Sequence, residues 1–314
     1  MSAFDEQRGG GSLGVCVAIL ALGWLVAIVS ALGYARLREE PSLDLALMRQ
    51  NPESLKRLLL HSDVKQLIND LLPVHGEYPL CVAVANRDLQ SVLLLLKHGA
   101  SPDARFTNSE LCFHSALQDA GLAFARVFLE HGVNLSLRSS TGRSILMIQG
   151  AFQLLGAQRI AELPRTLINA LDGNGRSALF LAVERRDEQL AVALLGAGAD
   201  PNIADKLGQT PLIMAVRWGA LKISQALLDA GANVNHQDSR GTTALMAAIV
   251  QGHKTARTAV QLLIEHGADA SLRDISGKTA LQCAGSLSAQ DFAAVKMLLA
   301  PANAPATVSA YEQR

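Results

Sequence analysis

The chain has 314 residues, of which 49% are hydrophobic and 18% are charged, so it has enough apolar side chains for a large core and is not a disordered chain. Its 28 Lys and Arg residues balance its 28 Asp and Glu residues, which excludes bulk electrostatic attraction to nucleic acid as the main activity. The four Cys residues form no closely spaced pair, which excludes a disulfide-stapled scaffold and a Cys-rich zinc domain.

A long uncharged segment lies near the N-terminus. The 23 residues from Leu13 to Ala35 contain no charged side chain. At 1.5 Å per residue such a helix is about 34 Å long, enough to cross a hydrocarbon core of about 30 Å. We therefore predict a short N-terminal tail over residues 1–12 and a single-pass transmembrane helix over residues 13–35. This anchor would place the protein in a membrane, the inner or plasma membrane if the source is bacterial.

The alternative to an anchor is a cleaved signal peptide, with small residues for cleavage at Val29-Ser30-Ala31 and at Gly33-Tyr34-Ala35. The first eight residues carry two acids and one base, and the apolar run exceeds the 7–15 residues of a signal h-region, so the uncleaved anchor is favoured. The side of the membrane that the rest of the chain faces stays open, because Arg36 and Arg38 outnumber Arg8 by a single residue.

Residues 36–74 are predicted to form a linker and a helical N-terminal cap. Residues 43–50 and 53–61 carry apolar side chains at helical spacing, and Asn51-Pro52 lies between them as a turn. The pattern predicts a divergent helix pair that joins the anchor to the next region.

The following region, residues 75–302, repeats with a period of 33. Gly208-Gln209-Thr210-Pro211-Leu212 and the later run Gly231-Ala232-Asn233-Val234-Asn235 recur one period earlier as 175–179 and 198–202. We expect seven units, the last of them offset by three additional residues, and a C-terminal tail over residues 303–314. The units open at Gly76, Ser109, Gly142, Gly175, Gly208, Gly241 and Gly277.

Elementary helix chemistry accounts for each recurring mark. Thr210 has the hydroxyl of an N-cap residue, and Pro211 follows at the first helical position, where its missing N–H costs nothing. Leu-Leu pairs such as Leu227-Leu228 belong to a buried helical face. The glycine after such a pair, as at Gly231, suits a left-handed C-cap. Asp172, Asp205, Asp238 and Asp274 each lie three residues before a unit's first glycine, a turn position.

The Gly-x-Thr-Pro-Leu and Gly-Ala-x-x-Asn marks at this period resemble the ankyrin repeat family. The resemblance implies an all-α solenoid of helix pairs with projecting β-hairpin loops, here preceded by the one transmembrane helix. Stacked units would bury their apolar faces against their neighbours. The third unit has Pro164 in its second-helix region, 155–167, and lacks the Gly-Ala mark, so an irregular turn or a kink is expected there.

The resemblance also implies a function and a surface. A protein partner of unknown identity would bind the concave and hairpin face, so we predict a membrane-tethered interaction scaffold. The alternative is a specific inhibitor or immunity-type regulator of one enzyme or toxin. Family contacts are made by exposed positions of the first helix and by the turn tips. Carried onto this chain, these positions are Met214, Arg217, Trp218, Leu181, Glu184, Arg185, Asn174, Lys206 and Arg240.

Among these positions, Arg217 and Trp218 are the strongest candidates, since Arg and Trp dominate binding hot spots. Trp218 could equally be a packing residue at the end of its helix.

No enzymatic activity, cofactor, metal ion, nucleic acid or small-molecule substrate is predicted. Gly9, Gly11 and Gly14 spell G-x-G-x-x-G, but the dinucleotide interpretation needs a preceding strand and a βαβ unit, which the sequence does not indicate. His98, His131 and His266 share one repeat position, which puts them too far apart for one ion and near helix C-termini instead.

Overall fold

A computed structural model describes residues 42–299, except residues 62–63, 65–66, 74–75, 251–255 and 285–288. The predicted anchor over residues 13–35 and the predicted tails lie outside the described residues. Within the described ranges, no helix is long and apolar enough to cross a membrane. The chain divides into two compact units, residues 1–100 and residues 101–314, each of which is described by itself.

The first unit contains two helix pairs. The first pair is α2 (Leu43–Met48) and α3 (Pro52–Leu58), and the second is α5 (Pro79–Ala85) and α6 (Leu89–Lys97). Within this unit α2 packs on α5 and α3 packs on α6. The Asn51 side chain accepts a hydrogen bond of 3.1 Å from the Ser54 N–H, and Pro52 follows at the first helical position. The predicted Asn-Pro turn is therefore the N-cap of α3.

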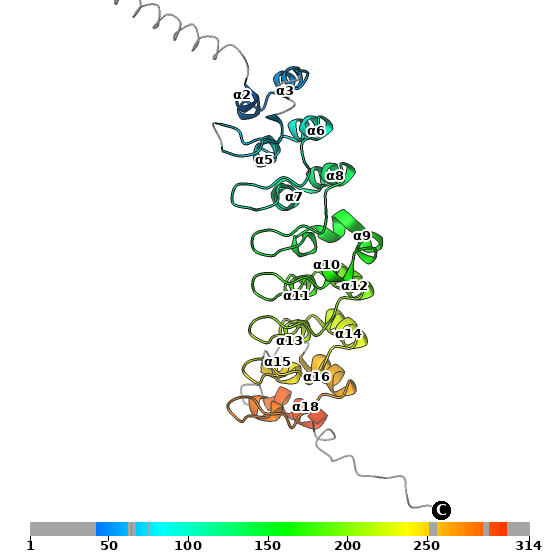
Figure 1. The fold of residues 1–314 in the computed structure, drawn as a ribbon. Coiled ribbons are helices and arrows are strands. Elements are labelled where there is room, and N and C mark those ends of the chain that lie inside the picture. Colours follow the sequence, from blue (N-terminus) through cyan, green and yellow to red (C-terminus); the bar gives the residue numbers. More distant parts are fainter. Residues whose placement is uncertain are drawn as a thin grey trace, which may run out of the picture. The chain divides into compact units, whose positions relative to one another are not determined.

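The second unit is a stack of helices in two layers (Figure 1). The inner helices, on the side from which the turns project, are α7 (Cys112–Ser115), α11 (Ala178–Glu184), α13 (Pro211–Arg217), α15 (Ala244–Val250) and α17 (Ala280–Cys283). The outer helices are α8 (Leu122–Glu130), α9 (Ala151–Ala161), α12 (Glu188–Gly196), α14 (Leu221–Asp229), α16 (Ala256–Glu265) and α18 (Ala289–Leu299). Successive helices of each layer pack on each other from α11 onward, which confirms the predicted stack of helix pairs.

The predicted caps of the inner helices are confirmed. The hydroxyls of Ser177, Thr210 and Thr243 accept from the backbone N–H three residues later, at 3.1, 3.4 and 3.3 Å. The apolar positions of the repeat then fill the core, and the side chains of Leu212 and Leu227 are fully buried. Each of these three helices thus begins directly after its hydroxyl residue and buries the face that the sequence marks as apolar.

The loops are less regular than hairpins with paired strands. No strand is present in the part of the chain that the structure describes, so the predicted β-hairpin loops are reduced to turns. Three of these turns are each closed by a single isolated antiparallel bridge: Arg105 with Leu111, Leu171 with Ser177, and Arg273 with Thr279.

The third of the seven repeat units, which opens at Gly142, departs most from the pattern. A 3₁₀ turn, Ile145–Met147, replaces its first helix, a departure that the sequence analysis did not anticipate. Its second-helix region contains a kink within α9 at Gly156, whose φ is 70°, and Pro164 precedes the short helix α10 (Arg165–Ile168). The expected irregularity between residues 155 and 167 is therefore confirmed. In the second repeat unit, which opens at Ser109, α7 continues directly as a π-helix, Ala116–Ala120.

The residue that opens each repeat adopts the left-handed conformation. The φ angle at these seven positions lies between 63° at Gly76 and 77° at Gly277, and the series includes Ser109 at 67°. A residue with a Cβ atom is strained in this region, by about 1–2 kcal/mol. Ser109 is thus the one position of the series that carries this strain.

We expect Ser109→Gly to raise the free energy of unfolding by about 0.5–1 kcal/mol, because relief of the strain exceeds the larger entropy loss of glycine on folding. Urea denaturation of the two chains measures the difference. Ser109→Ala keeps the Cβ atom and should bring no gain, so a stabilised Ala variant would contradict the strain at this residue.

Candidate partner-binding surface

Each turn tip is shaped by the predicted aspartate. Oδ1 of Asp172 accepts from the N–H groups of Asn174 and Arg176, at 2.8 and 2.9 Å. Asp205, Asp238 and Asp274 make the same two bonds in their turns, all at 2.8 or 2.9 Å. Burial by itself raises the pKa of Asp172, but the backbone donors and the Arg176 guanidinium outweigh it and hold that pKa below its ordinary value.

Successive turns are joined tip to tip by backbone hydrogen bonds. The N–H donors are Gly173, Lys206, Ser239 and Ile275, and each reaches a carbonyl oxygen of the preceding turn, at Thr141, Asn174, Leu207 and Arg240 respectively, over 2.8–3.2 Å. We call the tips at residues 141, 173–174, 206–207, 239–240 and 275 the turn row. The row holds its tips at fixed spacing beside the inner helices.

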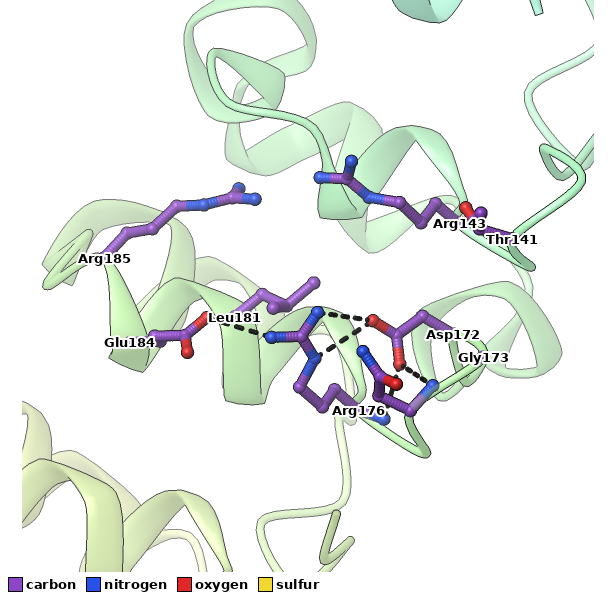
Figure 2. A pocket seen from close by; sticks show the side chains of 9 residues that line it. Thr141, Arg143, Asp172, Gly173, Arg176, Leu181, Glu184 and Arg185 are labelled. Atoms are coloured by element: carbon purple, nitrogen blue, oxygen red, sulfur yellow. Dashed lines mark hydrogen bonds and ion pairs between the residues drawn. The ribbon is translucent and has the colours of Figure 1, made fainter. Parts of the chain in front are cut away.

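Three hollows lie between the turn row and the inner helices. The first, of about 460 Å³, is bounded by Thr141, Arg143, Asp172, Arg176, Leu181 and Arg185, among others (Figure 2). The second is bounded by residues that include Leu207, Arg217, Asp238 and Arg240. The third shares Thr141 and Arg143 with the first and also contains Glu110 and Asp119.

One repeat position lines all three hollows. It is the residue directly after the one that opens each repeat unit, a glycine in every case but Ser109, and it is occupied by Glu110, Arg143, Arg176, Gln209 and Thr242. The sequence analysis missed this position. Its signal is the variable residue x of the Gly-x-Thr-Pro-Leu mark, which differs in charge from unit to unit while its neighbours stay alike.

The three arginines of the first hollow differ in their ion pairs. Arg176 contacts both of its carboxylates, with Nη2 at 3.0 Å from Asp172 Oδ2 and Nη1 at 3.4 Å from Glu184 Oε2. Neither Arg143 nor Arg185 forms an ion pair with any residue that the structure describes, and Figure 2 shows their guanidinium groups pointing toward each other. Partial burial and the charge of Arg143 lower the pKa of Arg185.

Arg143 is also incompletely satisfied. Its Nη2 donates to the carbonyl oxygen of Met147 over 3.4 Å, while its Nε is buried and has no hydrogen-bond partner among the described residues. A buried donor without a partner costs about 1–3 kcal/mol.

Of the predicted pair, Arg217 lines the second hollow, and Trp218 follows it as the C-cap residue of α13. The Trp218 side chain is 45% exposed. Its indole N–H donates to the sulfur of Met214 over 2.8 Å, and the guanidinium carbon of Arg186 lies 5.6 Å from the ring centroid. Arg217 lines the hollow and lies 3.9 Å from Asp238. The ring is thus both supported from one side and accessible.

Two of the predicted helix positions are not exposed. Leu181 is 2% exposed and Met214 is 9% exposed, so the expectation of exposed contact residues is wrong for both. Their side chains point inward because the inner helices bury most of their circumference. Leu181 lies in the wall of the first hollow, and Met214 supports the Trp218 ring.

The other predicted residues divide between the hollows. Asn174, Glu184 and Arg185 line the first hollow, whereas Arg240 joins Arg217 at the second. Lys206 is exposed on the turn between them and lines none of the three hollows. Six of the nine residues therefore line two separate hollows, and the nine do not form one continuous lining.

A buried histidine lies behind the third hollow. His114 is 2% exposed, and its Nδ1 is 3.6 Å from Glu110 Oε1. Burial, followed by the charges of Arg143 and Arg105, lowers the pKa of His114 to about 4. Burial also raises the pKa of Glu110. Because both groups are shifted toward their neutral forms, burial dominates over any ion pairing between them.

Histidines were predicted near the C-termini of three helices, and this placement is confirmed at His131 and His266. Nδ1 of His131 is 2.8 Å from the Val127 carbonyl oxygen, and Nδ1 of His266 is 2.9 Å from that of Leu262. Both rings therefore bond to the last turn of their own helices. No group of three or more potential metal-ligating His, Cys, Asp or Glu side chains occurs among the described residues.

The chain belongs to the ankyrin repeat family. A family profile described as "Ankyrin repeats (3 copies)" matches residues 151–238 and 226–308, and one described as "Ankyrin repeat" matches residues 75–106. The ankyrin repeat domain of Bcl-3, described as a unique member of the IkappaB protein family, is 27% identical over 82% of this chain and 96% of that one, with a TM-score of 0.46.

A second solved structure, the ankyrin repeat protein EF0377, is 21% identical over 71% of this chain and 97% of that one, with a TM-score of 0.45. Ankyrin repeats are protein–protein interaction modules, so the described part of the chain is an interaction domain.

Proposed function

We propose that this protein is a membrane-tethered interaction scaffold whose partner binds along the turn row and the adjacent ends of the inner helices. Two observations carry the proposal: arginines line the first and second hollows, and the exposed Trp218 directly follows Arg217 of the second hollow. Arg and Trp are enriched at the centres of protein interfaces. The backbone of the turn row is already fixed, so binding costs little ordering of the chain.

The membrane tether is part of the same proposal. The uncharged segment from Leu13 to Ala35 supports it, since its length suits a bilayer. Carbonate extraction of membranes should leave the full-length chain in the pellet. Release of the intact chain, or a mature N-terminus at Leu32 or Arg36, would contradict the tether.

The binding surface is tested by the double variant Arg217→Ala, Trp218→Ala. We expect it to lose about 2 kcal/mol or more of partner affinity, because it removes two hot-spot side chains from one exposed spot. The partner is obtained by crosslinking from membranes, and its affinity for each purified chain is measured by titration calorimetry.

Lys222→Ala is the control, because Lys222 is exposed on the outer helix α14, where its Nζ lies 3.4 Å from Glu188 Oε1. Retained affinity with a melting temperature lower by several degrees would mean that Arg217 and Trp218 serve the fold. If the captured partner is an enzyme or toxin, its activity with and without the scaffold separates a passive tether from an inhibitor.

A further inference from the structure

The residues that line the first hollow include one more positive than negative side chain. Three guanidinium groups, Arg143, Arg176 and Arg185, face two carboxylates, Asp172 and Glu184, and three minus two leaves one. Both carboxylates are already engaged by Arg176. The excess charge therefore resides on Arg143 and Arg185.

These two arginines are held facing each other by separate elements. Arg143 precedes the N-cap residue of the 3₁₀ turn Ile145–Met147, and Arg185 is the C-cap residue of α11. Their like charges oppose each other, and this repulsion adds to partial burial in lowering the pKa of Arg185. An anion placed between the two groups would relieve this repulsion and could accept from donors that have no partner within the described residues, such as the outer N–H groups of Arg185.

The surroundings favour a single carboxylate over a polyanion. One monovalent anion brings the charge of the first hollow to zero. On the other side of Arg143, the third hollow contains Glu110 and Asp119, whose charges would repel a neighbouring phosphate of a nucleic acid or a charged membrane surface. A planar carboxylate also matches the fork of a guanidinium group, which can hold it with two parallel hydrogen bonds.

We propose that the hollow formed by Arg143, Arg176 and Arg185 binds the carboxylate of an Asp or Glu side chain in an acidic segment of the protein partner. This inference rests on the proposed function and names the chemistry that the partner must bring to the turn row. Arg143 and Arg185 bind the carboxylate directly, while Arg176 forms ion pairs with Asp172 and Glu184.

The test uses the full-length chain and a fluorescein-labelled peptide, Ser-Gly-Glu-Gly-Ser-Glu-Gly-Ser, with a twin in which Gln replaces both Glu residues. Fluorescence anisotropy measures binding. The Glu peptide should bind at least about tenfold more tightly than the Gln peptide, corresponding to about 1.4 kcal/mol. Arg143→Gln and Arg185→Gln should each weaken the Glu peptide at least about fivefold and leave the Gln peptide unchanged.

Arg126→Gln is the matched control. Arg126 is exposed on the outer helix α8, so this substitution removes the same charge from another face of the molecule. It should change binding less than about twofold. An equal loss in Arg126→Gln and Arg185→Gln would overturn the proposal, as would equal binding of the two peptides. Because the Arg185 side chain is exposed, the Arg185→Gln variant should have the melting temperature of the parent chain. Its result therefore tests the proposal even if Arg143→Gln folds poorly.

Two further measurements test whether the hollow prefers another anion. The carboxylate assignment would be overturned if inorganic phosphate displaced the Glu peptide at a lower concentration than acetate does. It would also be overturned if a ten-residue oligothymidylate bound more tightly than the peptide and its binding depended on Arg185. The crosslinked partner separates the two proposals. If it binds the Arg143 and Arg185 variants as well as the parent chain, the carboxylate site is wrong and the scaffold stands. If no partner crosslinks to the turn row, the proposed function itself fails.

Discussion

Gly241→Ala is expected to lower the free energy of unfolding by about 3 kcal/mol. Gly241 has a φ of +71°, where an alanine is strained by about 1–2 kcal/mol. A Cβ atom there would also lie 2.9 Å from the Cα of Asp274 and 3.0 Å from the backbone nitrogen of Ile275. Both are backbone atoms of the next turn, so the contact is relieved only by separating two turns, at a further cost of about 1–3 kcal/mol.

Gly277→Ala is the matched control for this prediction. Gly277 has nearly the same backbone conformation, with a φ of +77°, but a Cβ atom there meets nothing within 4 Å. Its loss should be only the conformational part, about 1–2 kcal/mol. Urea denaturation of both variants measures the two losses, and equal losses would show that the close approach of the turns does not contribute.

Acidification is expected to destabilise the protein through His114 by up to about 3 kcal/mol. The folded pKa is about 4 and the reference value is 6.5, so between these values the unfolded chain binds more protons at this residue. The stabilising contribution is therefore complete above pH 6.5 and is lost as the pH falls toward 4. Glu110 acts in the opposite direction, because its folded pKa is raised, and reduces the net slope.

His114→Met isolates this contribution from that of the carboxylates. Methionine occupies the same repeat position at Met147 and Met246, where both side chains are buried, so the substitution suits the core. The melting temperature of the Met variant should fall less between pH 7 and pH 4.5 than that of the parent chain. Parallel profiles for the two chains would mean that His114 takes up its proton without opposing the fold.

The regular part of the fold was predictable because its determinants are local. The hydroxyl of Thr210, the proline after it and Gly231 each act within one helical turn of their own position, and a period of 33 residues repeats them in phase. The roles of such residues can be predicted from the sequence of a single repeat, because they do not depend on contacts with the rest of the molecule. Ser109 was assigned to the glycine position by phase alone, and its φ of 67° agrees.

The first helix of the third unit could not be predicted in the same way. Ser144 stands at the N-cap position, yet its hydroxyl is buried without a hydrogen-bond partner among the residues that the structure describes, and only a 3₁₀ turn follows. The turn ends at Ile148, whose backbone is extended, and Gly150, with a φ of 90°, is the N-cap of α9. A Cβ atom added at Gly150 would lie 3.3 Å from the Leu117 side chain. Packing against the preceding repeat decides the local structure here, and the sequence of one unit does not contain that information.

The candidate surface was predictable only in part. Solvent-facing positions on turns, such as Asn174 and Arg240, follow from the repeat phase, and both line hollows. Leu181 and Met214 were assigned to the surface because the phase gives a residue's place on the helix but not how closely the adjacent units cover it. The opposed pair Arg143 and Arg185 depends on two repeats at once, so it emerges only when the units are stacked.

The joints of the turn row use backbone atoms, whereas the hollows beside them are lined by side chains. Each tip-to-tip bond runs from an N–H group to a carbonyl oxygen, which almost every residue type supplies. The variable residue after each opening glycine takes no part in these joints. A lineage can therefore exchange a glutamate, an arginine or a glutamine at that residue, one repeat at a time, and acquire a new binding partner while the scaffold keeps its stacking unchanged.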